Sequence, residues 1–184
     1  MALVYLSLGS NVGDRIGHLR KTVGCLKEGE DIRLIAVSCV YTSEPLGVIE
    51  QPSFLNAVVC IETSLPPEDL LLLTQAIERS FGRNGKGTGG PRTIDIDLLF
   101  YNNLVMNTPE LTIPHPRIPD RAFVLLPLTD IDASFRHPVS GETVTSLLQD
   151  RCHGQRVVLY RETLDSGVSS RKPETKELYG AKDV

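Results

Sequence analysis

The segment 94–101 is an apolar run that carries two acidic residues, Asp95 and Asp97. Successive side chains of an extended strand point to opposite faces, so this pattern predicts that Asp95, Asp97 and Leu99 share one face. The alternate positions then form the natural core-facing side of the strand: Ile94, Ile96, Leu98 and Phe100. A strand of this kind has a buried face and a face that carries paired carboxylates.

Two carboxylates about 6.5 Å apart along one strand face repel each other unless a cation lies between them. Oxygen ligands alone favour Mg²⁺ or Mn²⁺, and such ions commonly share their coordination with substrate phosphates. The pair Asp95 and Asp97 therefore predicts a metal site. The alternative interpretation is that both residues only solvate an exposed face of a sheet.

The segment before this strand is basic, whereas the chain as a whole is acidic. No acidic residue occurs from Arg79 to Ile94, although the whole chain has a net charge of −4. Backbone N–H groups of a glycine-rich loop can approach phosphate oxygens closely, and basic side chains supply the counter-charge. Together with the Asp pair, this loop predicts a metal–phosphate site, whereas a solvated basic loop is the alternative. The basic residues of the segment are Arg79, Arg83, Lys86 and Arg92.

Composition limits the remaining possibilities. A chain of 184 residues with 41% hydrophobic content supports one domain with a substantial core. It has no apolar run of transmembrane length, its start is strand-like rather than a charged signal-peptide start, and its acidic balance argues against a nucleic-acid partner. The cysteines show no metal-ligand spacing and are predicted to be reduced core thiols of a cytoplasmic protein: Cys25, Cys39, Cys60 and Cys152.

Hydrophobic periodicity predicts alternating strands and helices. The order suggests an α+β fold, a ferredoxin-like antiparallel sheet with helices packed on it in a single domain. The polar sequence after residue 160 predicts a domain at 1–160 and a disordered tail at 161–184. The expected elements are a strand at 2–8, a helix from Asp14 to about Gly29, β-rich segments at 34–41 and 54–63, a helix from Pro66, the strand 94–101, a short strand ending near Met106, and helices near 121–126 and 144–148.

Phe54 and Asn56 lie two residues apart on one expected strand, so a ring and an amide project from the same face. A flat heteroaromatic ligand with an amide-like edge suits that pair, because the ring can stack on its face and the amide can bind its edge. The alternative for Phe54 is ordinary core packing.

Several short blocks occur in an order that resembles the 6-hydroxymethyl-7,8-dihydropterin pyrophosphokinase family of folate synthesis. The resemblance extends from about Val4 to about Leu148. Its blocks are Gly9-Ser10-Asn11, Pro45-Leu46-Gly47, Gln51-Pro52, Phe54-Leu55-Asn56-Ala57, Gly90-Pro91-Arg92-Thr93-Ile94-Asp95-Ile96-Asp97, Pro114-His115-Pro116 and Arg121-Ala122-Phe123.

The resemblance implies transfer of the intact pyrophosphate of ATP to the hydroxymethyl group of 6-hydroxymethyl-7,8-dihydropterin, with release of AMP. It implies two Mg²⁺ ions held by Asp95 and Asp97, and catalytic roles for both together with Arg83 and Arg92. We expect a cytoplasmic monomer without nucleic-acid or membrane partners. The implied pterin contacts are Ser43, Pro45, Leu46, Phe54, Asn56, Asp95 and Phe123. The implied nucleotide contacts are Gln75, Glu78, Arg83, Lys86, Arg92, Leu98, Thr112, His115 and Arg121.

The chain departs from the family pattern at four positions. Gly89 stands where many relatives carry a tryptophan, and Lys86 stands in a loop where relatives often have a second arginine. Lysine supplies a point charge but no bidentate fork. Glu110 and Pro116 replace a basic residue and a tyrosine of some relatives, which affects the expected contacts with ATP.

Two other functions remain open at this stage. A magnesium-dependent nucleotidyltransferase also uses a Gly-Ser pair and an Asp-x-Asp motif, but there the two motifs lie close in sequence, whereas Ser10 and Asp95 are far apart. A non-catalytic ferredoxin-like module that binds a small ligand is the second alternative. It gives no reason for paired carboxylates beside an acid-free basic loop.

Overall fold

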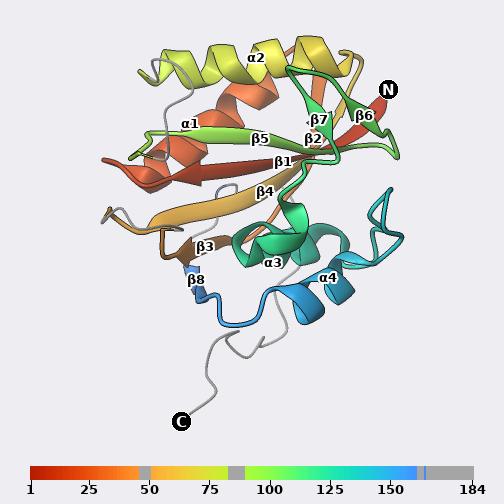
Figure 1. The fold of residues 1–184 in the computed structure, drawn as a ribbon. Helices are drawn as coiled ribbons and strands as arrows, with labels where there is room; N and C mark the ends of the chain where they lie inside the picture. The colour runs from red at the N-terminus through yellow and green to blue at the C-terminus, as the bar shows by residue number, and fades with distance from the viewer. Residues whose placement is uncertain (46–50, 83–89, 161–163, 165–184) are drawn as a thin grey trace.

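The computed structural model describes residues 1–45, 51–82, 90–160 and 164 (Figure 1). Its main sheet has six strands in the order β5-β1-β4-β3-β8, with β2 also paired to β4, and all these pairs are antiparallel. The elements are β1 (Ala2–Ser10), α1 (Arg15–Glu28), β2 (Ile32–Val37), β3 (Val40–Ser43), β4 (Phe54–Thr63), α2 (Pro67–Ser80), β5 (Asp95–Tyr101), β6 (Met106–Asn107), β7 (Thr112–Ile113), the 3₁₀ helix η1 (Ile118–Asp120), α3 (Ala122–Asp132), α4 (Val144–Arg151) and β8 (Val157–Tyr160). The predicted α+β class is confirmed.

Strand β4 is the centre of the sheet. It pairs with β1 from Leu55 to Thr63, and its other edge is shared by β2 and β3. The sequence predicted one β-rich segment at 34–41, but the chain forms two strands that are separated at Ser38. The Ser38 N–H donates to the carbonyl of Val58 (2.9 Å), and the Ser38 hydroxyl accepts from the Val58 N–H (2.8 Å). A side chain thus replaces a backbone partner there, and the ladder is interrupted.

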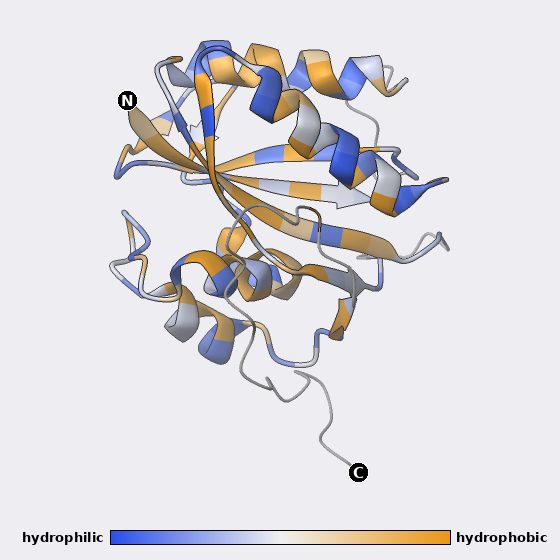
Figure 2. Ribbon diagram, turned by 180° about the vertical axis from the view of Figure 1, so that it is seen from behind, coloured by the Kyte–Doolittle hydropathy of each residue, from blue (hydrophilic) through white to orange (hydrophobic). Residues whose placement is uncertain are grey.

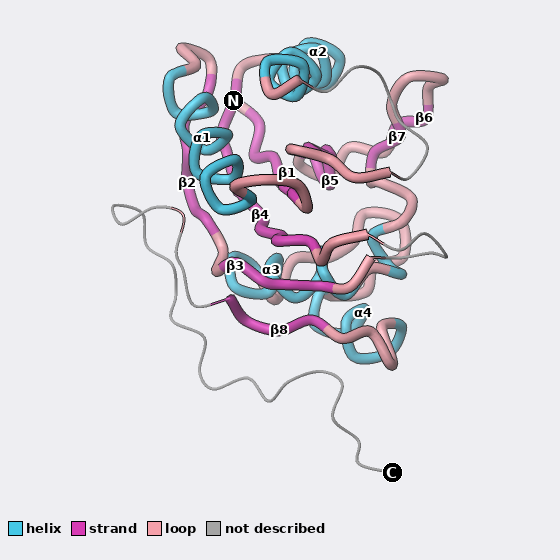
Figure 3. Tube along the Cα trace, turned by 90° about the vertical axis from the view of Figure 1, so that its left-hand side faces the viewer, coloured by secondary structure: helices cyan, strands magenta, loops and turns pink. Residues whose placement is uncertain are grey.

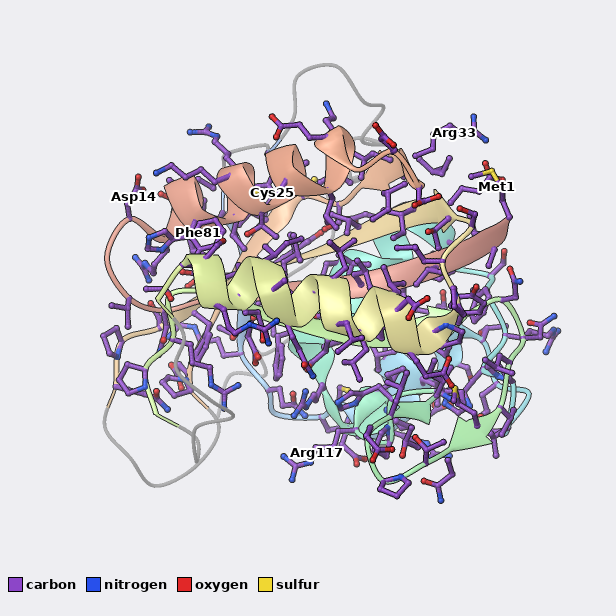
Figure 4. The ribbon with its side chains drawn as sticks, turned by 90° about the horizontal axis from the view of Figure 1, so that it is seen from above. Met1, Asp14, Cys25, Arg33, Phe81 and Arg117 are labelled. Atoms are coloured by element: carbon purple, nitrogen blue, oxygen red, sulfur yellow. The ribbon has the colours of Figure 1, made fainter. Side chains whose placement is uncertain are left out.

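Helices α1 and α2 lie side by side across one face of the sheet (Figures 1 and 4). The predicted cap of α1 is present, because the Asp14 carboxylate accepts from the Gly17 N–H at 3.0 Å. Helix α2 starts at Pro67, where a missing N–H costs nothing. In Figure 2 both helices alternate between hydrophilic and hydrophobic residues, as expected for helices with one buried face. The core beneath them includes Leu6, Leu8, Leu19, Leu26, Ile61, Leu70 and Ile96.

Helices α3 and α4 cover part of the opposite face and enclose a second core, so the sheet is buried on both sides (Figure 3). This core includes Tyr5, Val58, Phe100, Leu125, Leu128 and Leu147. Each central strand therefore buries residues on both faces, which explains its nearly continuous apolar sequence.

The prediction for β5 was wrong at Phe100. The apolar positions before it pack in the first core as expected, but Leu99 and Phe100 both belong to the second. The cause is a shift of register, because Tyr5 pairs with Phe100 whereas the next residue, Leu6, pairs with Leu98. Leu99 is the extra residue of a bulge, which moves the following side chain to the other face.

The C-terminal half holds three further differences. Strand β8 was not predicted, and it adds to the edge of β3. The short strand expected to end near Met106 instead begins there and pairs with β7 in a separate two-stranded sheet. Leu164 is buried against the first core. The remaining residues of 161–184 lie outside the described residues, so the domain boundary at 160 stays a prediction.

Three of the cysteines are buried thiols as expected, but the prediction was wrong for Cys25, which is exposed on α1. Burial raises the pKa of the Cys60 thiol to about 12 and that of the Cys152 thiol to about 11. Within the described ranges, no helix combines the length and apolar character needed to cross a membrane.

Candidate functional site

The candidate site occupies the part of the sheet that α3 and α4 leave open. Strand register places Asp97 beside Ser7 and Asp95 beside Gly9, and Gly9 is paired on its other side with Asn56. Side chains of directly paired residues project from the same face of a sheet. A carboxylate, a glycine and an amide therefore form one row across β5, β1 and β4.

Gly9 has no side chain, so the row is open at its centre. A Cβ atom at Gly9 would lie 3.6 Å from Asn56 Oδ1 and 3.8 Å from Phe54 Cδ1. The missing side chain thus leaves room for a flat ligand between the amide and the carboxylates. A cavity of about 330 Å³ opens here, and five residues predicted to contact a pterin line it: Ser43, Phe54, Asn56, Asp95 and Phe123.

Asn56 is 3% exposed, and its amide is held in one orientation. Its Nδ2 donates to the Ser43 hydroxyl at 2.9 Å and to the Tyr41 carbonyl at 3.5 Å. The Asn56 side-chain oxygen has no hydrogen-bond partner among the described residues. Buried acceptors are normally satisfied. An unsatisfied oxygen at a cavity wall therefore favours a ligand that brings an N–H donor.

A second cavity, of about 380 Å³, lies along the outer edge of β5, between α2 and the segment around β7. Predicted nucleotide contacts from three parts of the chain line it: Gln75, Glu78, Leu98, Thr112 and His115. The tertiary structure therefore gathers residues as far apart in sequence as Gln75 and His115.

The two cavities meet at a cluster of charged side chains. Arg92 forms a hydrogen-bonded ion pair with Asp95, and Arg121 Nη1 lies 3.3 Å from Asp97 Oδ2. Each carboxylate therefore has one guanidinium beside it. The residues shared by both cavities are Arg92, Asp95, Asp97, Arg117 and Arg121.

The side chains of Asp95 and Asp97 are 20% and 32% exposed, so a ligand can reach both. Hard carboxylate oxygens on one face suit Mg²⁺, which retains waters and binds substrate phosphates. In the ranges that the structure describes, no group of three or more His, Cys, Asp or Glu converges as a metal site. The pair can therefore supply part of a coordination sphere, which water or phosphate oxygens would complete.

His115 faces the same carboxylates from the segment after β7. Its Nδ1 accepts from the Arg117 N–H at 3.2 Å, so the proton of the neutral ring lies on Nε2, 4.0 Å from Asp97 Oδ2. Burial lowers the pKa of His115, while Asp97 opposes that shift. Burial likewise lowers the pKa of Arg121, again opposed by Asp97. Both groups carry N–H donors that face Asp97, and such donors bind anions.

Glu78 has a structural partner that the sequence did not predict. Its carboxylate accepts from the Ile96 N–H at 2.8 Å, so it ties α2 to the free edge of β5. Edge strands carry unpaired N–H groups that side chains can satisfy. Glu78 still lines the second cavity, but part of its hydrogen-bonding capacity is already used.

Asn11 belongs to the Gly9-Ser10-Asn11 block, and its hydrogen bonds show that it positions Arg92. Its backbone N–H donates to the Arg92 carbonyl (3.0 Å), and its side-chain oxygen accepts from the Arg92 N–H (2.6 Å). Its Nδ2 donates to Gln51, which lines the first cavity. Asn11 is 1% exposed and holds the backbone of Arg92 against the segment that contains Gln51.

The sequence did not predict a role for Arg117, which lines both cavities. In the view of Figure 4 it lies on the side of α2 that is away from α1. The available signal was its place directly after the Pro-His-Pro block. Pro45, a predicted pterin contact, is not among the residues lining either cavity, whereas its neighbour Glu44 lines the first. Three further predicted contacts lie outside the described residues: Leu46, Arg83 and Lys86.

Known proteins share this sequence pattern. The family model described as 7,8-dihydro-6-hydroxymethylpterin-pyrophosphokinase matches residues 5–133. A 2-amino-4-hydroxy-6-hydroxymethyldihydropteridine pyrophosphokinase of Bacillus subtilis is 44% identical over 129 residues, which cover 70% of this chain and 77% of that protein. The enzyme of the same name from Porphyromonas gingivalis is 45% identical over 142 residues, covering 75% and 95%.

Longer proteins also contain this unit. A folic acid synthesis protein of Pneumocystis carinii is 42% identical over 146 residues, which cover 79% of this chain but 20% of that protein. The crystal structure of Plasmodium falciparum HPPK-DHPS A437G with SDX-DHP has a TM-score of 0.66 at 17% identity, covering 80% of this chain and 45% of that one. The latter likeness shows the fold. By its matched length and its identity to the bacterial proteins, the chain belongs to the 7,8-dihydro-6-hydroxymethylpterin-pyrophosphokinase family.

Proposed function

We propose that this protein transfers the intact pyrophosphate of ATP to the hydroxymethyl oxygen of 6-hydroxymethyl-7,8-dihydropterin, releasing AMP, as a step of folate biosynthesis. The observation that carries this proposal is the junction of two cavities at one charged cluster. Asp95 and Asp97 line both cavities, and so do the three arginines that surround them. A donor in one cavity and an acceptor in the other would meet at these residues.

The first cavity is proposed to bind the pterin. Phe54 and Phe123 supply apolar rings for its faces, and the unsatisfied oxygen of Asn56 accepts from an N–H on its edge. In this proposal the hydroxymethyl substituent points toward the carboxylates, because Gly9 leaves the space between Asn56 and Asp95 open.

The second cavity is proposed to bind ATP. Arg92, Arg117 and Arg121 line the cavity where it meets the first, and guanidinium groups bind phosphate oxygens well. His115 Nε2–H is a further donor from the same wall. Four residues belong to the proposed function on the family pattern alone: the loop residues Arg83 and Lys86, and the pterin contacts Pro45 and Leu46.

In the proposed reaction the hydroxymethyl oxygen forms a bond to the β-phosphorus of ATP. The bond between that phosphorus and the oxygen shared with the α-phosphorus breaks, AMP leaves, and the hydroxyl proton is released. Preorganised cations stabilise the charge that develops on the bridging and equatorial oxygens. We propose that Asp95 and Asp97 hold two Mg²⁺ ions, which when bound supply charge neutralisation along the polyphosphate.

We also propose that the protein acts as a cytoplasmic monomer on these two small substrates, without a nucleic-acid or membrane partner. The net charge of −4 supports the absence of a nucleic-acid partner, since backbone binding needs a wide basic surface. Light scattering of the purified protein measures its oligomeric state directly.

The test incubates the protein with ATP, Mg²⁺ and 6-hydroxymethyl-7,8-dihydropterin and follows the products by ³¹P NMR. The expected result is AMP release that depends on the pterin, together with a diphosphate ester of the pterin. Release of inorganic pyrophosphate with transfer of AMP would instead identify a nucleotidyltransferase. Binding of pterin without turnover would identify a non-catalytic module.

A further inference from the structure

The segment between α4 and the start of β8, residues 152–157, contacts Ser43 in one wall of the first cavity and the residue before Asp120 in the other. At its end, Val157 pairs with Ser43 of β3. At its beginning, the buried Cys152 thiol donates to the carbonyl of Pro119 at 3.7 Å. All of this segment lies outside residues 5–133, the part of the chain that the family model matches. Figure 1 shows β8 beside β3 and below α3.

Gln155, in the middle of this segment, makes two hydrogen bonds to the start of α3. Its Oε1 accepts from the Ala122 N–H at 2.9 Å, and its Nε2 donates to the carbonyl of Asp120 at 2.8 Å. The two hydrogen bonds therefore hold the backbone on either side of Arg121. The partners lie more than 30 positions apart in sequence.

Helix α3 needs such a contact because its own sequence provides no cap. Arg121 occupies the N-cap position and makes no side-chain cap hydrogen bond. The first N–H groups of a helix lack intrahelical partners and are normally satisfied by the side chain of a Ser, Thr, Asp or Asn. Here the amide of Gln155 takes that place, which leaves the Arg121 side chain available to the site.

The side chains at this helix start define one wall of the charged junction. Arg121 Nη1 lies 3.3 Å from Asp97 Oδ2, and its guanidinium carbon lies 5.6 Å from the centre of the Phe123 ring. Both contacts depend on where the backbone between Asp120 and Phe123 lies. A small rotation of this first turn would move the cation and the ring together.

We infer that Gln155 is a positioning residue, which caps α3 from outside the family-matched region and so sets Arg121 and Phe123 against the reacting groups. Its effect on turnover rests on the proposed function, whereas its effect on the backbone does not. The two are therefore measured separately, with Gln155→Leu, Gln155→Glu and, as a matched control, Gln149→Leu on the exposed side of α4.

The first measurement is amide hydrogen exchange of Ala122 in the ligand-free protein. Gln155→Leu removes both hydrogen bonds at similar volume, so exchange at Ala122 is expected to accelerate at least about tenfold, or about 1.4 kcal/mol. Gln155→Glu keeps an acceptor oxygen, and protection is expected to persist. Unchanged exchange in Gln155→Leu, or equal loss in both variants, overturns the capping role whether or not the protein is active.

The second measurement is a double-mutant cycle on kcat/KM with Arg121→Ala. Introduced alone, Gln155→Leu is expected to lower kcat/KM about tenfold. Introduced into Arg121→Ala, it is expected to have little further effect, because the effects of substitutions at residues that act together are not additive. Gln149→Leu is expected to match the unaltered protein. Multiplicative losses would show that Gln155 acts through general stability, and the positioning role would be abandoned.

A failure of the proposed function gives a different result. In that case the unaltered protein shows no pterin-dependent release of AMP, while the exchange at Ala122 still responds to Gln155→Leu. Loss of that exchange response alongside normal turnover contradicts only the role of Gln155.

Discussion

At the residue scale, Asp95 and Asp97 are neutralised by arginines before any ligand is considered. Each carboxylate has a guanidinium beside it, and these partners come from different segments, Arg92 just before the strand and Arg121 at the start of α3. The repulsion that the strand pattern alone implies is therefore offset within the protein. Removing one carboxylate therefore relieves little repulsion, and we expect the free energy of unfolding to change little.

Asp97→Asn is expected to lower the rate of pyrophosphate transfer at least about 10²-fold, or about 2.7 kcal/mol in the barrier. The free energy of unfolding is expected to change by less than about 1 kcal/mol, because partly exposed ion pairs contribute little. Steady-state kinetics and urea unfolding measure the two quantities. Asp150→Asn, on the exposed surface of α4, is the control. Near-normal turnover in Asp97→Asn would rule out the proposed role of the carboxylate pair.

Asn56→Ala is expected to weaken pterin binding far more than ATP binding. It removes the buried oxygen proposed to accept from the pterin edge, and an unpaired buried group costs about 1–3 kcal/mol. Calorimetric titration with each substrate measures the difference. Asn103→Ala, in an exposed turn, should change neither affinity. Equal losses for both substrates would show that Asn56 has a structural role only.

At the element scale, α3 is fixed at both ends. Its start is held by Gln155, and near its end the buried Asp130 carboxylate accepts from the Tyr41 hydroxyl (2.8 Å) and from the Cys39 N–H (3.2 Å). Burial, followed by the nearby Asp130, raises the pKa of Tyr41. The hydroxyl therefore stays protonated and donates to Asp130. The helix that carries Phe123 is thus tied to the strand that carries Ser43.

Tyr41→Phe removes the hydroxyl of this connection and leaves the Asp130 carboxylate with one donor fewer. The expected loss is about 1–3 kcal/mol in the free energy of unfolding. Tyr160→Phe is the control, since the Tyr160 hydroxyl has no polar partner among the described residues. Urea unfolding of both variants makes the comparison. Equal stability of Tyr41→Phe and Tyr160→Phe would contradict a stabilising role for the connection.

At the scale of the whole molecule, two cores pack against opposite faces of the sheet. A buried histidine beside the second core makes the stability of the protein depend on pH. His137 packs against Phe100 and accepts from the N–H groups of Val139 and Ser140 through Nδ1, at 3.3 Å each. Burial lowers the pKa of His137 below its ordinary value of 6.5, with Glu142 opposing and Arg151 adding to the shift. The folded state therefore resists protonation of this ring.

This shift has a defined sign. The unfolded chain takes up a proton near pH 6.5 while the folded protein does not, so the stabilisation present above pH 6.5 is lost as the pH falls toward the folded pKa. His137→Asn keeps an acceptor oxygen and cannot titrate, so its melting temperature should fall less between pH 7.5 and 5. The exposed His153→Asn is the control. Parallel pH profiles for the unaltered protein and His137→Asn would contradict this assignment.

Local sequence patterns predicted most of the elements. The period of apolar residues and the cap at Asp14 placed α1, and a β-rich apolar stretch placed β4 at its observed bounds. The helix predicted near 121–126 continues to Asp132 instead, and α3 contains Pro127 in its interior, where proline usually breaks a helix. Strand β8 was missed because four residues at an edge carry too little periodicity to be recognised.

Spacing along the chain, together with the resemblance to the family, predicted most of the candidate site residues. Asp95 and Asp97 on one strand face, and Phe54 and Asn56 on that of another strand, follow from spacing along the chain, whereas the ordered blocks around them carry the resemblance to the family. Such patterns are visible because strand and helix periods act over a few residues.

The way in which these groups face one another depends on the packing of distant segments. The bulge at Leu99, the arginine partner of Asp97, the place of Arg117 between two cavities and the cap from Gln155 all join segments that are distant in sequence. Their geometry depends on strand register and on the need to satisfy buried polar groups across the fold. Neither quantity is encoded in any local stretch of sequence.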